Sequence, residues 1–253
     1  MHKFFAEPEQ IGEETICLTG ENCHHVRHVL RLKNGQEILI KDGQGTDYYC
    51  IIEESGDAEI ICRIEDIQRS FVELPVSVSL FQGLPKQEKM EWIIQKCVEL
   101  GVSDIYPVAM KRSVSKIDAK TAAKKTERWN KIAESAAKQS GRDIVPVVHQ
   151  PISFRQALMA AAKYQDFFVP HEAAEGIAAT RQALGAVKKA AQVGCMIGPE
   201  GGFSPEETQS LMQLANQRMV TLGKRILRTE TAGMVFLAML SIMIEEDMEW
   251  QQR

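Results

Sequence analysis

Over the first 70 residues, apolar and polar positions alternate in short runs separated by turn residues. The runs at 37–40, 48–52 and 59–64 are rich in isoleucine, and Asp42-Gly43 and Gln44-Gly45 stand between the first two. A period of two residues with such punctuation is typical of strands. Between residues 21 and 32 the apolar spacing becomes that of a short helix. We therefore predict a small β-barrel with one helix for residues 1–70.

From residue 71 onward, runs typical of strands alternate with runs typical of helices. Strands are expected at 76–81, 105–108, 145–148, 167–169, 195–197 and 219–222, and helices at 90–100, 120–139, 154–162, 180–191 and 229–246. This alternation predicts an α/β domain with a largely parallel sheet covered by helices on both faces. At 253 residues the chain is long enough for two unequal domains, which we place at 1–70 and 71–253.

Two helices carry further local information. Ser204, Pro205 and Glu207 have the spacing of a capping box with proline at the first helical position, so a helix begins there. Residues 234–240 are apolar nearly all round, so the last helix must be buried on more than one side, either in the core or in a dimer interface. The apolar run is too short to span a bilayer.

Composition and charge narrow the classes of function. A hydrophobic share of 44% and a charged share of 25% are those of a globular protein, and no apolar leader begins the chain, so we expect a cytoplasmic location. The six cysteines include no CxxC pair, and Cys23-His24-His25 has no second ligand pair, so we expect reduced thiols and no metal.

Charge is distributed unevenly along the chain. Residues 1–70 carry 7 Lys/Arg against 14 Asp/Glu, whereas residues 86–142 carry 13 Lys/Arg against 7 Asp/Glu. That positive stretch is either a nucleic-acid surface or a set of solvated helix faces.

The segment 197–203, Ile-Gly-Pro-Glu-Gly-Gly-Phe, lies between a predicted strand and the capped helix. Its three glycines permit positive φ and close approach of a ligand, although glycines can also simply shape a tight turn. The chain lacks the phosphate-binding motif GxxxxGK[ST], and Glu200 would repel phosphate. A second loop, 222–232, also follows a strand and precedes a helix. Two such loops should converge at the carboxyl ends of neighbouring strands, where open α/β sheets bind ligands.

Together the segments IGPEGGFSPEE (197–207) and LGKRILRTETA (222–232) resemble the SPOUT superfamily of methyltransferases, in particular the ribosomal RNA small subunit methyltransferase E family. KCVELG (96–101), AKQSGR (137–142) and HHVRHVLR (24–31) fit the same pattern, so the resemblance covers nearly the whole chain. It implies a PUA-like RNA-binding barrel, a C-terminal domain tied in a deep trefoil knot, and a homodimer. It also implies S-adenosylmethionine as methyl donor and uridine N3 of 16S ribosomal RNA in the assembled small subunit as substrate. The residues implied to bind the cofactor are Ile197, Gly198, Glu200, Gly201, Gly202, Leu222, Gly223, Ile226, Leu227 and Arg228.

Uridine N3 must lose a proton, and a nearby guanidinium favours the anionic ring, so Arg225 and Arg228 are the catalytic candidates. Glu230 either takes the proton or fixes an arginine, and we favour the second role because arginines would depress its pKa. The candidates for RNA contacts are Arg27, Arg31, Lys86, Lys89 and Arg142, the last of which can instead reach the cofactor. The alternatives are a SPOUT ribose 2′-O-methyltransferase and a non-catalytic RNA-binding factor of ribosome assembly.

Overall fold

A computed structural model describes residues 1–69, 72–86, 89–115 and 119–245. The chain forms two compact units, Met1–Glu73 with Ala137–Val145, and Leu74–Ala136 with Pro146–Arg253. The first unit is therefore discontinuous in sequence, because the end of a long helix and the loop after it belong to it. The domain boundary predicted between residues 70 and 71 lies outside the described residues.

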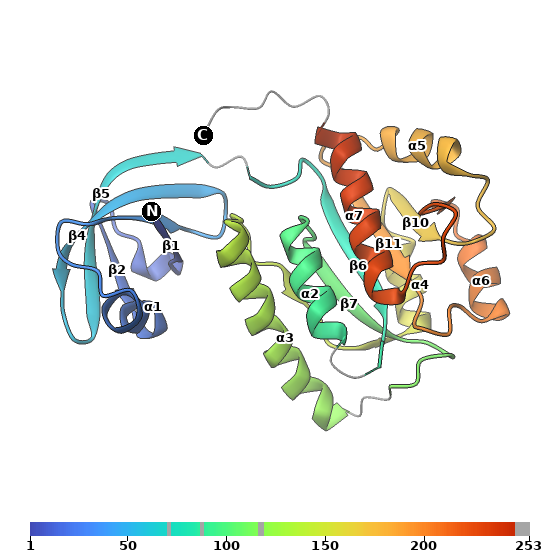
Figure 1. Ribbon diagram of the computed structural model, residues 1–253, viewed down its shortest axis with the longest axis horizontal. Helices are drawn as coiled ribbons and strands as arrows, with labels where there is room; N and C mark the ends of the chain where they lie inside the picture. Colours follow the sequence, from blue (N-terminus) through green and yellow to red (C-terminus); the bar gives the residue numbers. More distant parts are fainter. Residues whose placement is uncertain (70–71, 87–88, 116–118, 246–253) are drawn as a thin grey trace. The chain divides into compact units, whose positions relative to one another are not determined.

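The first unit contains a five-stranded sheet in the order β1-β3-β4-β5-β2. Its strands are β1 (His2–Phe5), β2 (Thr15–Thr19), β3 (Glu37–Lys41), β4 (Thr46–Ser55) and β5 (Glu59–Arg69). β1 pairs with β3 in parallel and the other pairs are antiparallel. Alternate residues of these strands point to one core, which includes Ile16, Ile38 and Ile60. The strands thus form a half-barrel, in agreement with the small β-barrel that the alternating pattern predicts (Figure 1).

The helix predicted at 21–32 is shorter and irregular. A 3-10 turn, η1 (Pro8–Gln10), precedes β2, and α1 (Gly20–His24) follows it and continues into a π-helical turn, η2 (His25–Val29). The amide of Leu30 bonds to the carbonyl of His25, five residues back. Arg31 then has a φ of 53°, a left-handed conformation that ends the helix.

Buried charges attach the segment Ala137–Val145 to the sheet of the first unit. The ammonium of Lys41, at the end of β3, lies 2.6 Å from a carboxylate oxygen of Asp47 and 2.5 Å from one of Asp143. Lys41 is 2% exposed. Arg142 is buried as well and pairs with Glu73, whose carboxylate also accepts the backbone N–H of Asp143. Opposite charges therefore satisfy one another where water is excluded.

The second unit is built on a seven-stranded sheet in which every pair is parallel, in the order β12-β10-β11-β6-β7-β8 with β9 beside β7. Its strands are β6 (Ser77–Gly83), β7 (Asp104–Ala109), β8 (Val147–Val148), β9 (Ile152–Ser153), β10 (Asp166–Pro170), β11 (Gln192–Ile197) and β12 (Gln217–Val220). The short strand β9 is absent from the sequence prediction, because two residues are too few to show a period.

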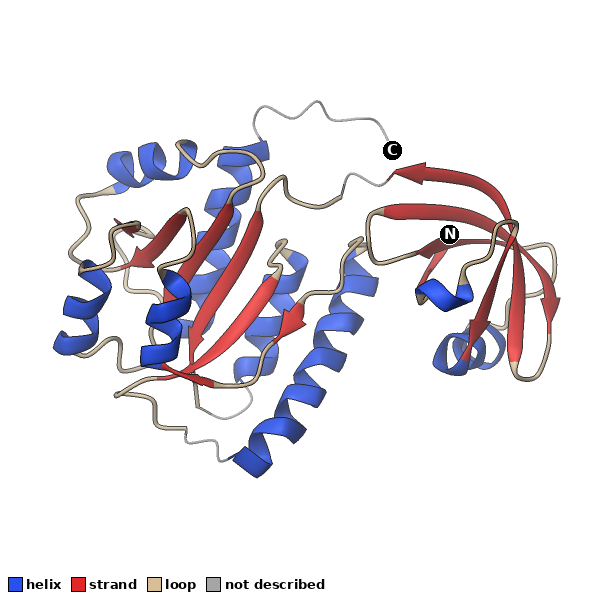
Figure 2. Ribbon diagram, turned by 180° about the vertical axis from the view of Figure 1, so that it is seen from behind, coloured by secondary structure: helices blue, strands red, loops and turns tan. Residues whose placement is uncertain are grey.

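Helices cover both faces of this sheet (Figure 2). They are α2 (Lys89–Glu99), α3 (Ala119–Ser140), α4 (Phe154–Ala161), α5 (Ile177–Gly185), α6 (Pro205–Met212) and α7 (Thr229–Glu245). On one face Phe81 and Phe167 pack with Ala157 of α4 and Leu211 of α6. On the other, Phe168 meets Phe236 of α7 with ring centroids 5.4 Å apart. Neighbouring strand residues thus point to opposite faces, and both are buried.

The last helix shows why its sequence is apolar nearly all round. α7 packs against α2, α5 and β11, so more than one side of it is covered, as predicted. Helix α5 begins at Ile177 and ends at Gly185, earlier than the predicted 180–191, and Ala190 has a left-handed φ of 62° before β11. In the described residues no helix combines the length and apolarity needed to cross a bilayer. The trefoil knot stays a prediction.

Candidate functional site

The loops after β11 and β12 meet at the carboxyl end of the parallel sheet. β10 lies between these two strands, so they are not the direct neighbours that the sequence prediction assumed. The contact is nevertheless close, because the hydroxyl of Thr229, where α7 begins, donates a hydrogen bond of 2.6 Å to the carbonyl of Gly198. The two segments chosen from the sequence therefore belong to one site.

The first loop, residues 198–204, is tightly packed. The amide of Gly202 bonds to the carbonyl of Pro199 at 2.9 Å, and Gly202 has a φ of +67°, which favours glycine. A Cβ atom on Gly83, the last residue of β6, would lie 2.6 Å from the nitrogen of Pro199. Only glycine at position 83 therefore allows the loop to lie against the end of β6.

The start of α6 fixes the other end of this loop. Ser204 accepts the backbone N–H of Glu207, whose side chain accepts the N–H of Ser204 at 2.8 Å, which confirms the predicted capping box. The Glu207 carboxylate is buried and also accepts the N–H of Lys111, at 2.7 Å, from the segment after β7. The capping residue thus joins two loops at this end of the sheet.

Glu200, within the first loop, is held by residues that follow β6. Its carboxylate oxygen Oε1 accepts the backbone N–H of Lys86 at 3.0 Å and lies 3.2 Å from the ammonium of Lys89. Burial works to raise the pKa of Glu200, but the hydrogen bonds from Lys86 and Lys89 outweigh it and hold the pKa below its ordinary value. The other oxygen, Oε2, is buried without a hydrogen-bond partner in the described part of the chain.

Lys89 joins the two loops through charge. Its ammonium lies 3.2 Å from Glu200 and 3.3 Å from Glu230, near the start of α7. These hydrogen bonds, the one to Glu200 foremost, raise the pKa of Lys89, which therefore stays protonated. We expected Lys89 to contact RNA phosphate and Glu230 to fix an arginine. The ion pair described for Glu230 is with Lys89, and both roles remain predictions.

The second loop, residues 221–228, is more open. The hydroxyl of Thr221 accepts the N–H of Gly223, whose φ is +110°, and the buried Thr180 accepts the N–H of Thr221 at 2.9 Å. Beyond this anchor the side chains of Arg225 and Arg228 are exposed, and that of Ile226 is 91% exposed. The candidate arginines thus lie on an accessible part of the second loop.

Sequence reasoning did not single out two residues of this site. Arg112 donates a hydrogen bond of 3.0 Å to the carbonyl of Gly201, and Gln82 donates one of 2.9 Å to the hydroxyl of Thr229. Arg112 lies in the positively charged stretch 86–142, so its charge was the sequence feature that could have marked it as a candidate. Gln82 directly follows the predicted strand 76–81 and belongs to β6 in the structure, so the sequence pattern gave no specific signal for it.

The remaining candidates for RNA contacts lie in the first unit and differ in exposure. Arg27 pairs with Asp57 and donates to the carbonyl of Gly56 at 2.8 Å, whereas Arg31 is exposed. Arg142 is 4% exposed and its guanidinium forms an ion pair with Glu73, so in the structure this guanidinium is buried inside the first unit. These RNA contacts stay predictions.

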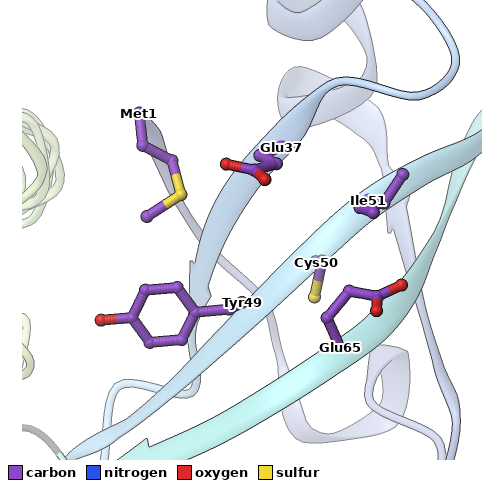
Figure 3. A pocket seen from close by; sticks show the side chains of 6 residues that line it. All are labelled: Met1, Glu37, Tyr49, Cys50, Ile51 and Glu65. Carbon is purple, nitrogen blue, oxygen red and sulfur yellow. The ribbon is translucent and has the colours of Figure 1, made fainter.

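A pocket also lies on the sheet of the first unit, and a cysteine and two glutamates are among the residues that line it (Figure 3). It is lined by Met1, Glu37, Tyr49, Cys50, Ile51 and Glu65. Burial and the neighbouring Glu65 raise the pKa of the Cys50 thiol to about 12, so it is unreactive at neutral pH. Among the described residues no group of three or more histidine, cysteine or acidic side chains is placed to hold a metal ion.

Comparisons with known proteins agree with this arrangement. Residues 72–241 match the RNA methyltransferase domain model, and residues 18–65 match the RNA methyltransferase PUA domain model. Ribosomal RNA small subunit methyltransferase E of Bacillus subtilis is 37% identical, over 97% of this chain and 98% of its own length. The same enzyme from Neisseria gonorrhoeae, solved bound to S-adenosylmethionine, is 31% identical with a TM-score of 0.80 over 94% of this chain and 95% of its own.

A further solved structure, a putative methyltransferase from Legionella pneumophila in complex with S-adenosylmethionine, is 31% identical with a TM-score of 0.81, over 94% of this chain and 96% of its own. Both matched models describe parts of RNA methyltransferases, so the chain is an RNA methyltransferase whose catalytic domain follows a PUA domain. The chain belongs to the ribosomal RNA small subunit methyltransferase E family.

Proposed function

We propose that this protein transfers the methyl group of S-adenosylmethionine to N3 of a uridine in 16S ribosomal RNA of the assembled small subunit. The observation that carries the proposal is the joining of the two glycine-containing loops, through Thr229 and Gly198, in a chain of this family. Two similar structures, each 31% identical, contain S-adenosylmethionine. Methylation of ribosomal RNA follows from membership of the family. The choice of the uridine N3 atom as the methylated position is our proposal.

The residues of the two loops fit such a cofactor. Gly202 and Gly223 adopt positive φ and carry no side chain, so an adenosine can approach their main-chain groups closely. Leu222, Ile226 and Leu227 supply apolar surface for a base, and Ile226 is largely exposed. When bound, the cofactor supplies a methyl group on a sulfonium. The contribution of the protein is then chiefly to hold the nucleophile in line with it.

Arg225 and Arg228 are the residues that we assign to the substrate. Both are exposed, so an RNA base can reach them. A guanidinium near the uracil ring favours loss of the N3 proton, because it stabilises the negative charge left on the ring oxygens. Glu230 shares the ammonium of Lys89 with Glu200, so we assign it a structural role rather than that of general base.

We place the RNA backbone against Arg27 and Arg31 of the PUA-type unit and against Lys86 and Lys89 of the methyltransferase unit. Lys86 and Arg31 are exposed, which suits contacts with phosphate. Arg142 would act on RNA only after release from Glu73.

We also propose that the enzyme is cytoplasmic, where ribosomal subunits mature, and that it is a homodimer. Light scattering on a sizing column should then give twice the 28.4 kDa of one chain.

Methyl transfer is tested with small ribosomal subunits that lack the modification. Subunits are incubated with the protein and labelled S-adenosylmethionine, and the digested RNA is examined by nucleoside mass spectrometry. We expect label in 3-methyluridine, with less label when naked 16S RNA replaces the subunit. Label in a ribose-methylated nucleoside would instead indicate the 2′-O-methyltransferase alternative. Absence of any label from a protein that binds RNA but not the cofactor would indicate a non-catalytic assembly factor.

A further inference from the structure

Three residues from distant parts of the chain form a hydrogen-bonded group that we call the loop latch: Gln82, Gly198 and Thr229. Gln82 Nε2 donates to Thr229 Oγ1 at 2.9 Å, and the same hydroxyl donates to the carbonyl of Gly198 at 2.6 Å. Gln82 lies in β6, Gly198 opens the first loop, and Thr229 begins α7 after the second loop. The loop latch therefore joins both loops to the carboxyl end of the central strand β6.

The orientation of the Gln82 amide is fixed by its surroundings. Its Nε2 also lies 3.0 Å from the carbonyl of Gly83, and a carbonyl oxygen accepts hydrogen bonds but never donates them. The nitrogen must therefore point toward Gly83 and Thr229. The amide oxygen Oε1 is left buried with no hydrogen-bond partner among the described residues. Gln82 thus acts on Thr229 only as a donor.

The buried amide oxygen of Gln82, unpaired within the described residues, lowers the stability of the fold, so a role in packing alone does not explain a glutamine at this position. Gln82 is 0% exposed and Thr229 is 6% exposed. A buried amide oxygen without a partner destabilises the fold, and an apolar side chain of similar size would avoid that cost. What the glutamine gains is a donor that orients the Thr229 hydroxyl toward Gly198. The start of the first loop, at Gly198 and Pro199, is then held by this bond and by its contact with Gly83.

We propose that Gln82 and Thr229 are positioning residues for methyl transfer, which hold the Gly198 carbonyl so that the two loops bind S-adenosylmethionine together. The inference rests on the proposed function, because it concerns the same cofactor. It predicts that loss of the Thr229 hydroxyl acts on cofactor binding. Affinity for RNA should not change, because neither side chain reaches the surface.

The test compares Thr229→Val with Thr229→Ser, which keeps the hydroxyl, and with Gln82→Leu, which removes both the donor and the unpaired oxygen. Thr126→Val is the matched control, because the Thr126 hydroxyl is buried on α3 without a partner in the described residues. The readouts are the calorimetric Kd for S-adenosylmethionine, KM for cofactor and for small subunits, and the melting temperature. Thr229→Val should raise the Kd and the cofactor KM about tenfold, which corresponds to about 1.4 kcal/mol. Thr229→Ser and Thr126→Val should stay within about twofold of the wild type.

Gln82→Leu keeps the inference testable if Thr229→Val does not fold. It should weaken cofactor binding severalfold while the melting temperature is unchanged or higher. Wild-type affinity for the cofactor in either Thr229→Val or Gln82→Leu would overturn the loop latch, as would an equal rise in the KM for RNA. If the wild-type protein itself does not bind S-adenosylmethionine, the proposed function fails first and the inference fails with it.

Discussion

Two lysines of this protein each lie between two carboxylates, and their surroundings differ. Lys41, in the first unit, lies between Asp47 and Asp143, and its side chain is 2% exposed. Lys89, in the second unit, lies between Glu200 and Glu230, and its side chain is 33% exposed. The ion pairs of Lys41 are also shorter, at 2.6 and 2.5 Å against 3.2 and 3.3 Å.

The two clusters contain the same chemical groups, one lysine and two carboxylates. The difference in burial therefore decides whether such a cluster contributes mainly to stability or to the arrangement of a site. In the interior, water cannot replace a lost partner, so each charge is needed by the others. At a partly exposed site, water and salt weaken the attraction, and the groups can exchange partners when a ligand arrives. We therefore assign Lys41 to the stability of the first unit and Lys89 to the arrangement of the two loops.

Replacing Lys41 should have the largest effect. Lys41→Met leaves the buried carboxylates of Asp47 and Asp143 without their cation, so we expect a loss of about 3–5 kcal/mol in the free energy of unfolding of the first unit. Urea unfolding measures this loss, with the exposed Lys163 as control through Lys163→Met. A loss below about 1 kcal/mol would contradict the distinction between the two lysines.

Neutralising one partner of Lys41 should cost less. Asp143→Asn keeps an oxygen that accepts a hydrogen bond but removes the charge, so we expect a loss of about 1.5–3 kcal/mol in the same measurement. Asp143 also accepts the backbone N–H of Val72, at 3.4 Å, so the variant tests the attachment of the segment Ala137–Val145. Unchanged stability would mean that this attachment depends on Arg142 and Glu73 instead.

Replacing Lys89 should change function more than stability. For Lys89→Met we expect the free energy of unfolding to stay close to that of the wild type, because the ion pairs of Lys89 are partly exposed. The Kd for S-adenosylmethionine should rise a few-fold, since Glu200 and Glu230 then repel each other across the loops. Calorimetry measures the Kd, and Lys89→Arg should restore it. Because Lys89 is also proposed to contact RNA phosphate, Lys89→Met should lower the slope of the salt dependence of RNA binding by about one unit.

The smallest expected effect concerns pH. The pKa of Glu200 is lowered in the folded protein, so its carboxylate stabilises the fold above the ordinary pKa of about 4.3, and this contribution is lost as the pH falls through the lowered pKa. The melting temperature of the wild type should exceed that of Glu200→Gln by a constant amount near neutral pH, and the two should converge in acid. Melting curves of both proteins across this pH range check the sign. A difference that grows in acid would contradict it.

Much of the fold could be predicted because its signals are local. The alternation of strand and helix patterns after residue 71 gave the parallel sheet with helices on both faces, and Ser204, Pro205 and Glu207 marked the start of α6. The irregular helix at 20–29 was not predictable, because a π-helical turn has the same apolar residues as an α-helix and differs only in its backbone hydrogen bonds.

For the candidate site, the sequence supplied the residue types and the tertiary structure supplied their partners. The glycines of the first loop and the motif around Arg225 and Arg228 are visible in the sequence, because conformational freedom and charge belong to individual residues. Glu230 has Lys89 as its ion-pair partner, 141 residues away. Gln82 meets Thr229 across 147 residues.

The amino-acid sequence by itself thus determined the elements, the two loops and the resemblance to a methyltransferase family. Only the tertiary structure decided that Lys41 is buried and that Lys89 is at the joined loops. It also decided that the end of α3 belongs to the first unit. The physical reason is that hydrophobic periodicity reports which face of an element is covered. The partner of a polar side chain depends instead on which distant strands the fold places side by side.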